Sequence, residues 1–169
     1  VTGCNYCRAH IPAKQTSSLE SLSDLVSPYR SNSRKPDVIV PFSGGRDSSF
    51  ALHIIKEKLN LNPIAFTYDW GLVTDLARRN AARICGQLGV EHIIRTPNIA
   101  RKRKYIRKNI QAWLKKPELG MIPLFMAGDK AFYHFARQLR KETDIKLVFF
   151  CTGNMMENCP FKFGLSGVR

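Results

Sequence analysis

The residues best suited to chemistry lie together in one short segment, Ser43 to Ser48, which reads Ser-Gly-Gly-Arg-Asp-Ser. The segment follows an apolar, β-branched run that begins at Val38 and precedes apolar residues at helical spacing. A strand, a glycine turn and a helix in this order form an anion site, because the first N–H groups of a helix are unpaired and carry a partial positive charge. Glycines also let the backbone approach a phosphate closely. The sequence therefore predicts a phosphate-binding turn at Gly44 and Gly45.

Two common phosphate-binding motifs do not match this turn. It lacks the Gly-Lys-Ser/Thr of a P-loop, and it lacks the spacing of the dinucleotide-binding G-x-G-x-x-G motif. An ordinary strand-to-helix turn remains the alternative. The flanking Ser43, Asp47 and Ser48 favour phosphate chemistry over that alternative.

Strand-like and helix-like segments alternate along the rest of the chain. We expect strands at 38–42, 64–68, 90–94 and 146–151, and helices at 47–59, 75–88, 99–116 and 127–140. Four alternations predict an α/β fold, with a Rossmann-like, open, mainly parallel sheet and helices on both faces. Because ligands bind at the carboxyl ends of such strands, the loops at Ser43, Asp69, Thr96 and Thr152 are expected to converge.

The sequence predicts three parts. Residues 1–16 form a short cysteine-bearing element, residues 17–36 form a short helix and linker, and residues 37–169 form the phosphate-binding domain. The chain begins with Val1 and its last residues have neither helix nor strand character, so we expect both ends to be incomplete.

Net charge and composition limit the chemical classes of molecule that this chain is expected to bind. The net charge is +14, from 27 Lys and Arg against 13 Asp and Glu, which predicts an anionic partner. The densest basic run is Arg101 to Lys104, followed by Arg107 and Lys108. It can be a solvated helix face, an RNA contact or a channel for a phosphorylated substrate. No apolar run reaches the length of a membrane span, and the five cysteines indicate intracellular thiols and a cytoplasmic location.

The segment Ser43 to Ser48 resembles the SGG-x-DS pyrophosphate loop of the PP-loop ATP pyrophosphatases, a branch of the adenine nucleotide alpha hydrolases. The resemblance implies an enzyme that cleaves ATP between the α- and β-phosphates and adenylates a carbonyl or amide oxygen. A nitrogen or sulfur nucleophile then displaces AMP.

Other segments are similar to N-acetyl sugar amidotransferases of surface-polysaccharide biosynthesis. They are Gly3-Cys4-x-x-Cys7-Arg8, Leu61 to Asp69, Arg78-Arg79-Asn80 and Thr96-Pro97-Asn98. This resemblance implies a nucleotide-linked sugar as substrate and a separate glutaminase subunit that supplies ammonia. The chain departs from the family at Pro123 to Gly128, where a further cysteine pair is often found.

ATP and Mg²⁺ are the implied cofactors of the turn. We expect the glycine N–H groups and the hydroxyls of Ser43 and Ser48 to hold the β- and γ-phosphates and to stabilise pyrophosphate as a leaving group. Asp47 repels phosphate, so its expected role is to hold Mg²⁺, with helix capping as the alternative. Arg46 stands where the family often has lysine and can neutralise phosphate charge.

Further residues are expected around the nucleotide. Phe42, Tyr68 and Asp69 end strands beside the turn and are expected to contact it, with Asp69 on the ribose. A solvated loop carboxylate is the alternative for Asp69. Gly153 and Asn154 follow the last strand and are expected to contact the acceptor or the α-phosphate.

The sequence supplies only two of the ligands that a structural zinc site needs. Cys4 and Cys7 form a C-x-x-C pair, which supplies two of the four ligands of a structural zinc. The amidotransferases that the chain resembles usually have an earlier C-x-x-C, and its absence agrees with a chain truncated at its N-terminus.

Three functions follow from these patterns. The first is an ATP-dependent amidotransferase that adenylates the amide oxygen of an N-acetyl sugar for attack by ammonia. The second is a PP-loop enzyme that modifies tRNA by thiolation or lysidine formation, favoured by the basic helix and the net charge. The third is a nucleotide-binding module without catalysis.

Overall fold

Four parallel strands form the sheet of the computed structural model, in the order β3-β2-β1-β4. The structure describes residues 18–33, 35–117 and 129–151. The strands are β1 (Val38–Pro41), β2 (Pro63–Tyr68), β3 (Glu91–Arg95) and β4 (Leu147–Val148). The predicted α/β fold is confirmed.

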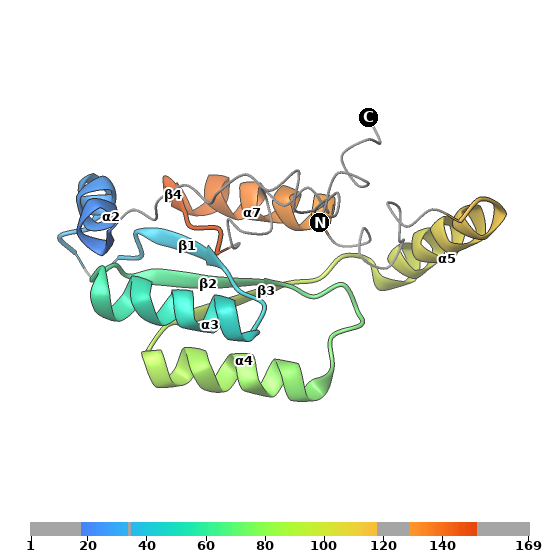
Figure 1. Cartoon of the computed structure of the whole chain (residues 1–169), viewed down its shortest axis with the longest axis horizontal. Coiled ribbons are helices and arrows are strands. Elements are labelled where there is room, and N and C mark those ends of the chain that lie inside the picture. The colour runs from blue at the N-terminus through green and yellow to red at the C-terminus, as the bar shows by residue number, and fades with distance from the viewer. Residues whose placement is uncertain (1–17, 34, 118–128, 152–169) are drawn as a thin grey trace, which may run out of the picture.

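Helices cover both faces of this sheet (Figure 1). They are α2 (Leu19–Val26), α3 (Arg46–His53), α4 (Asp75–Leu88), α5 (Ile99–Lys115) and α7 (Asp129–Thr143). In Figure 1, α7 lies above the sheet, α3 and α4 lie below it, and α5 projects to one side. A 3-10 turn, η1 (Ser27–Tyr29), follows α2, and a π-turn, η2 (Ile54–Lys58), follows α3.

Alternation along β1 and β2 divides the core into two clusters. Val38 and Val40 pack with Leu52 of α3 and Cys85 of α4 on one face of the sheet. Ile39 belongs to the other cluster, which includes Phe66, Ala136 and Leu139. Successive strand residues point to opposite faces, so a strand with helices on both sides is apolar throughout. β1 is therefore buried at all four positions.

Local signals fix the ends of two helices as predicted. Thr74 accepts a hydrogen bond from the Ala77 N–H at 3.2 Å and caps α4. Gly89 ends α4 in the left-handed region, at φ 61°. Asn98 caps α5 by accepting from the Arg101 N–H at 2.9 Å. These caps satisfy N–H and C=O groups that a helix cannot pair internally.

The first predicted helix, 47–59, differs from the structure in two ways. The N-cap is Gly45, which makes no side-chain cap hydrogen bond, so Asp47 lies in the first turn and does not cap the helix. The helix then widens into η2, where the Leu59 N–H donates to the Ile54 carbonyl at 2.9 Å. The wider turn places both Ile55 and Leu59 in the core.

The fourth strand is shorter than the predicted 146–151, and the cause is Pro41. The Phe149 N–H donates to the Ile39 carbonyl at 2.8 Å. The backbone N–H and C=O groups of the odd-numbered residues of β1 therefore point towards β4. The next bond of the ladder requires an N–H at residue 41, which proline lacks. The Phe149 carbonyl instead accepts from the Cys151 thiol at 3.6 Å. The chain leaves the sheet at this point.

Within the part of the chain that the structure describes, no helix is long and apolar enough to cross a membrane.

Asp37 ties the segment before β1 to the start of β2. Its side chain is buried, and its two carboxylate oxygens accept from the Asn62 N–H at 2.8 Å and the Ser31 N–H at 3.1 Å. Asp37→Ala leaves two N–H groups without their partner, so we expect a loss of about 2 kcal/mol in the free energy of unfolding. Urea denaturation measures the loss. Asp24→Ala, at an exposed position of α2, is the matched control, and an equal loss in both variants would refute this role of Asp37.

Candidate functional site

A cavity of about 500 Å³ lies at the carboxyl ends of β1, β2 and β4. It is lined by Pro41, Phe42, Ser43, Ser48, Thr67, Tyr68, Trp70, Val73, Phe132, Phe150 and Cys151. The expected convergence of loops is confirmed for the described segments after β1, β2 and β4, whereas Thr152 itself lies outside the described residues. The segment after β3 lies against the segment after β2, since a Cβ at Gly71 would lie 2.8 Å from Cδ1 of Ile99, but none of the described residues that line the cavity comes from the β3 loop.

Hydrogen bonds within the segment hold the glycine turn in shape. The Ser48 hydroxyl donates to the Gly45 carbonyl at 3.1 Å and accepts from the Ser43 N–H at 3.3 Å. The two serine oxygens are 3.0 Å apart. The Ser43 hydroxyl in turn accepts from the Gly45 N–H at 3.3 Å. The turn therefore closes on itself at the start of α3.

This closed arrangement changes what the two serines can offer. A hydroxyl has one proton to donate, and the proton of Ser48 is directed at the Gly45 carbonyl. With that proton on Gly45, the Ser43 hydroxyl donates the bond between the two serine oxygens. Either oxygen can be the donor of this bond, and when Ser48 donates it the Ser43 proton is free for a phosphate. A phosphate would be met first by the unpaired N–H groups of the first turn of α3.

Gly44 is required by the packing behind the turn. Its φ is +74°, in the left-handed region that favours glycine. A Cβ atom at this position would lie 3.2 Å from the Cβ of Ala81 on α4 and 3.6 Å from the Ala77 carbonyl oxygen. The turn therefore rests directly on α4, and a small residue on each side permits the contact.

Arg46 and Asp47 form an exposed ion pair at the start of α3, with 2.9 Å between Nε and Oδ1. Their side chains are 93% and 77% exposed, so the pair contributes little to stability and opens at low cost. Mg²⁺ in phosphate sites is commonly held by one or two carboxylates together with the phosphates. An exposed carboxylate beside the first-turn N–H groups fits that donor set. Asp47 would hold the ion, and Arg46 would be free to face phosphate.

The cavity wall opposite the glycine turn contains a buried hydroxyl group, that of Tyr68, without a hydrogen-bond partner among the described residues. The Tyr68 ring stacks on Phe135 with centroids 5.4 Å apart. Burial raises the pKa of Tyr68, so the hydroxyl keeps its proton. A buried polar group without a partner costs free energy, which a ligand or a water molecule would relieve.

Thr67 fixes the backbone at the entrance to the turn. Its hydroxyl donates to the Phe42 carbonyl at 2.6 Å and lies 2.8 Å from Nε2 of His92. Because the hydroxyl proton goes to the carbonyl, His92 must donate from Nε2. Burial lowers the pKa of His92, which favours the neutral ring, and in that form the bond places the proton on Nε2. His92 of β3 thus helps to hold the backbone at Phe42 by its hydrogen bond to Thr67 of β2.

Asp69 is buried beside the cavity and is not a solvated loop carboxylate, so that alternative is wrong. It is 6% exposed, and its oxygens accept from the Gly71 N–H and from Nε of Arg78, each at 2.9 Å. Burial raises the pKa of Asp69, but the Arg78 hydrogen bond, the Gly71 N–H and the Arg78 charge outweigh it, so the pKa lies below its usual value. Arg78 also pairs with Asp75. A contact of Asp69 with ribose stays a prediction.

Cys151 contributes a thiol to the cavity wall, and burial raises its pKa to about 11. The thiolate is the reactive form of cysteine, so this group is inert near neutral pH. Cys151 is not paired with the other described cysteine, Cys85.

Several predicted site residues lie outside the described residues: Gly153, Asn154, Cys4 and Cys7. Among the residues that are described, no group of three or more His, Cys, Asp or Glu could hold a metal ion. The predicted zinc half-site therefore stays a prediction.

Sequence reasoning missed much of the cavity wall. Thr67 carried a weak signal, as the one hydroxyl-bearing residue among the apolar residues of β2 before Tyr68. The walls supplied by Phe132 and Phe150 had no such signal, because they depend on where α7 lies over the sheet.

The Asp69–Arg78 pair predicts a change of stability with pH. Asp69 has an unfolded pKa of about 3.9 and a lower folded one, so its stabilisation is present above that value and is lost as the pH falls through the folded pKa. Arg78→Gln leaves the buried carboxylate without its cation, and we expect a loss of about 2 kcal/mol at pH 7. The difference from the wild type should shrink below about pH 4. Urea titrations at several pH values test this. Arg79→Gln is the exposed control, and a pH-independent difference would contradict the assignment.

Solved structures share this fold at low sequence identity. One is the NH3-dependent NAD synthetase from Campylobacter jejuni subsp. jejuni NCTC 11168, in complex with the nitrate ion. It matches with a TM-score of 0.50 and 23% identity over 82% of this chain. The match covers 56% of that synthetase, so the chain spans little more than half of its length.

A second is described as a predicted subunit of tRNA methyltransferase from Methanocaldococcus jannaschii DSM. It has a TM-score of 0.43 and 24% identity, over 70% of this chain and 53% of the other. No protein-family model matches the sequence, and no curated protein does. The comparison with the synthetase establishes the fold: a Rossmann-like α/β sheet of the kind found in NAD synthetase.

Proposed function

We propose that the chain is the ATP-binding part of an adenylating amidotransferase of the PP-loop ATP pyrophosphatase type. One observation carries the proposal: the self-braced turn from Ser43 to Ser48 presents the unpaired N–H groups of α3 beside a cavity of about 500 Å³. Ligand pockets are commonly of this size. The Ser-Gly-Gly-x-Asp-Ser order is that of the pyrophosphate loop in this class of enzyme.

The residues suggest how ATP would lie. The first-turn N–H groups of α3 face the β- and γ-phosphates, Arg46 balances their charge, and the Tyr68 hydroxyl supplies a donor on the opposite wall. Mg²⁺ on Asp47 would neutralise phosphate charge. With the phosphates fixed in this way, pyrophosphate is stabilised as the leaving group.

The proposed acceptor is the acetamido group of an N-acetyl sugar. Its amide oxygen attacks the α-phosphorus of ATP, the α–β bridging bond breaks, and pyrophosphate leaves. Ammonia then adds to the imidate carbon and AMP departs with the oxygen, which gives an acetamidino group. The resemblance of the regions around Cys4 and Leu61 to N-acetyl sugar amidotransferases supports this acceptor.

Release of AMP and pyrophosphate tests the proposal directly. ATP labelled in the α-phosphate is incubated with Mg²⁺, ammonia and candidate N-acetyl sugar nucleotides. We expect labelled AMP, with pyrophosphate in equal amount, only when an acceptor is present. Formation of ADP and phosphate instead would contradict the assignment, whereas ATP binding with no product from any acceptor would favour the module without catalysis.

Two glycine variants provide the matched comparison for that assay. Gly44→Ala places a Cβ against Ala81 at a positive φ, so we expect at least about a tenfold loss of ATP affinity. Gly86→Ala meets no atom within 4 Å, lies within α4, and should keep the affinity. Isothermal titration with ATP measures both, and equal affinities would exclude the turn as the phosphate site.

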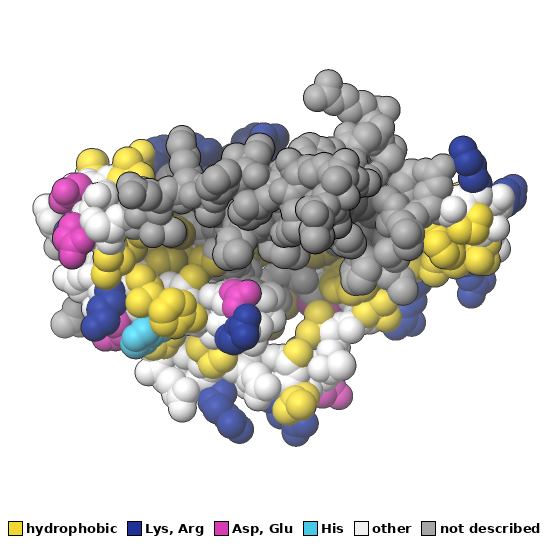
Figure 2. Space-filling view, in the orientation of Figure 1, with side chains coloured by type: hydrophobic (Ala, Val, Ile, Leu, Met, Phe, Trp, Pro, Cys, Tyr) yellow, Lys and Arg dark blue, Asp and Glu magenta, His cyan; other side chains and the backbone are white. Residues whose placement is uncertain are grey.

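The alternative, a tRNA-modifying enzyme, is favoured by α5. Exposed cations include Arg101, Arg103, Lys104, Arg107 and Lys108. Figures 1 and 2 show that α5 projects to the side of the molecule and that Lys and Arg side chains gather there. Helices with this charge bind nucleic acid through phosphates.

Binding of tRNA separates the two functions. Under the alternative, tRNA binds tightly at low salt and its affinity falls steeply as salt rises, and Arg103→Gln with Arg107→Gln reduces that slope by about two. A solvated helix face predicts no measurable binding at low salt. Filter binding across a salt series decides between these outcomes, and absence of binding removes the alternative.

A further inference from the structure

A basic groove leads away from the candidate site between α7 and β4. Two neighbouring cavities form it, with volumes of about 540 and 400 Å³. It begins at the aromatic side chains of Tyr133 and Phe150, passes Arg137 and Arg140, and ends at Lys146. We refer to it as the α7–β4 groove.

The groove adjoins the candidate ATP cavity at one side chain. Phe150 lines both that cavity and the first cavity of the groove. Arg137 and Arg140 line both cavities of the groove. A molecule that lies in the groove therefore has one end beside the cavity in which ATP is proposed to react.

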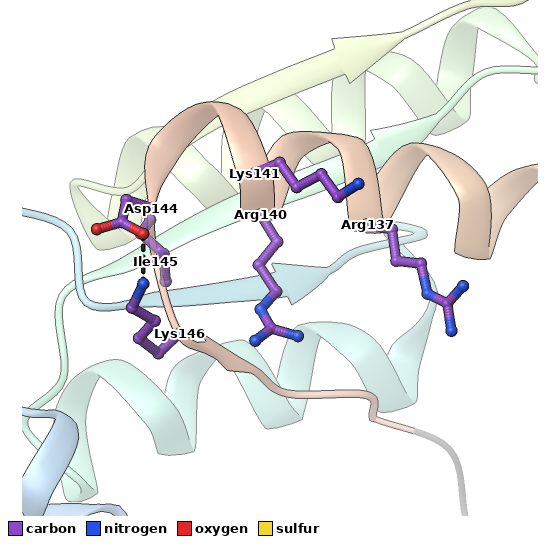
Figure 3. Close-up of a pocket in the computed structure, with 6 residues that line it drawn as sticks. All are labelled: Arg137, Arg140, Lys141, Asp144, Ile145 and Lys146. Carbon is purple, nitrogen blue, oxygen red and sulfur yellow. Dashed lines mark hydrogen bonds and ion pairs between the residues drawn. The ribbon is translucent and has the colours of Figure 1, made fainter.

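The far part of the groove carries uncompensated positive charge. Figure 3 shows Arg137 and Arg140 extending to the same side of α7, and Asp144 paired with Lys146. Within the described part of the chain, the ion pairs leave Arg137, Arg140 and Lys141 without an acidic partner, since Glu142 pairs with Arg95. A concave site with three unbalanced cations attracts an anion.

The near end of the groove has a different character. The rings of Tyr133 and Phe150 have centroids 5.2 Å apart. They are 50% and 38% exposed, which is unusual for a pair of large aromatic rings in contact. Exposed aromatic faces offer an apolar surface on which the flat side of a sugar or another ring can pack.

Spacing favours a small phosphorylated molecule over a nucleic acid. At 1.5 Å per residue, the helical rise from Arg137 to Lys141 is about 6 Å, and the rise from Tyr133 to Arg140 is about 10 Å. A strand of RNA needs a charged groove that follows several nucleotides. Arg137 and Arg140 are three residues apart, a helical rise of about 4.5 Å, so both guanidinium groups can reach one diphosphate and bind it through paired N–H donors.

We propose that the α7–β4 groove binds the acceptor as a diphosphate ester, with the diphosphate on Arg137 and Arg140 and the reacting group against Tyr133 and Phe150. The order along the groove places the anion away from the phosphates of ATP and the reactive end next to them. That this ligand is the acceptor rests on the proposed function. That the groove binds a diphosphate ester does not. A sugar diphosphate linked to a nucleoside and one linked to a lipid share this chemistry.

Binding to the full chain tests the groove while α,β-methylene-ATP saturates the other site. The probes are UDP-N-acetylglucosamine, a polyprenyl-diphosphate N-acetylglucosamine in detergent micelles, free N-acetylglucosamine and an oligouridylate. We expect one or both diphosphate probes to bind, and free N-acetylglucosamine to bind far more weakly. Which diphosphate probe binds identifies the source of the diphosphate.

Arginine variants locate the binding. Arg137→Gln and Arg140→Gln remove guanidinium groups at exposed helical positions, and each should weaken the bound diphosphate probe at least about tenfold. Affinity for α,β-methylene-ATP should be unchanged. Arg83→Gln, on α4 at the opposite face of the sheet, is the control and should alter neither affinity.

Any of three results would overturn the proposal. The oligouridylate alone could bind, neither diphosphate probe could bind, or a diphosphate probe could bind with an affinity that both arginine variants leave unchanged. The test also separates the groove from the reaction. If diphosphate probes bind through Arg137 and Arg140 but no acceptor yields pyrophosphate, the reaction assignment fails and the groove stands. If pyrophosphate forms and the KM for acceptor is unchanged in the double variant, the groove fails and the reaction stands.

Discussion

The contact between Gly44 and Ala81 is the constraint on which the candidate site depends. It brings the turn after β1 onto α4, where a Cβ on the turn would lie 3.2 Å from the Cβ of Ala81. Ser48 then closes the turn by bonding to Gly45 and Ser43, which fixes the direction in which α3 starts. The first-turn N–H groups are therefore aimed before any ligand arrives. Such preorganisation lowers the cost of binding an anion, because little has to move.

The neighbouring strands hold the two edges of this turn in place. On one side, Thr67 and His92 anchor the Phe42 carbonyl across three strands. On the other side, Asp69 links the end of β2 to Arg78 on α4, the same helix against which Gly44 packs. The polar side chains that brace the site are paired with one another or with the backbone, so they act as supports. Among the described residues, the groups free to meet a ligand include the backbone N–H groups, the Tyr68 hydroxyl and the exposed pair Arg46–Asp47.

Charge is distributed unevenly around this frame. The two faces of the sheet are covered by different helices, and α7 carries its arginines towards the edge strand β4, which ends early because Pro41 cannot donate to it. The early end leaves Phe150 and Cys151 free to line the candidate cavity. One missing N–H thus shapes both the wall of the ATP cavity and the start of the α7–β4 groove.

The sequence by itself determined the succession of strands and helices along the chain, the caps at Thr74 and Asn98, and the turn from Ser43 to Ser48. These depend on local periodicity and on the conformations that single residues prefer, which act over a few residues. The tertiary structure decided which groups face the cavity, that Asp69 is buried on Arg78, and that the two serines bond to each other. Those features depend on the register of β1 against β2 and β4 and on the packing of α4 and α7. Such contacts join residues far apart in the chain, and no local pattern encodes the distances between them.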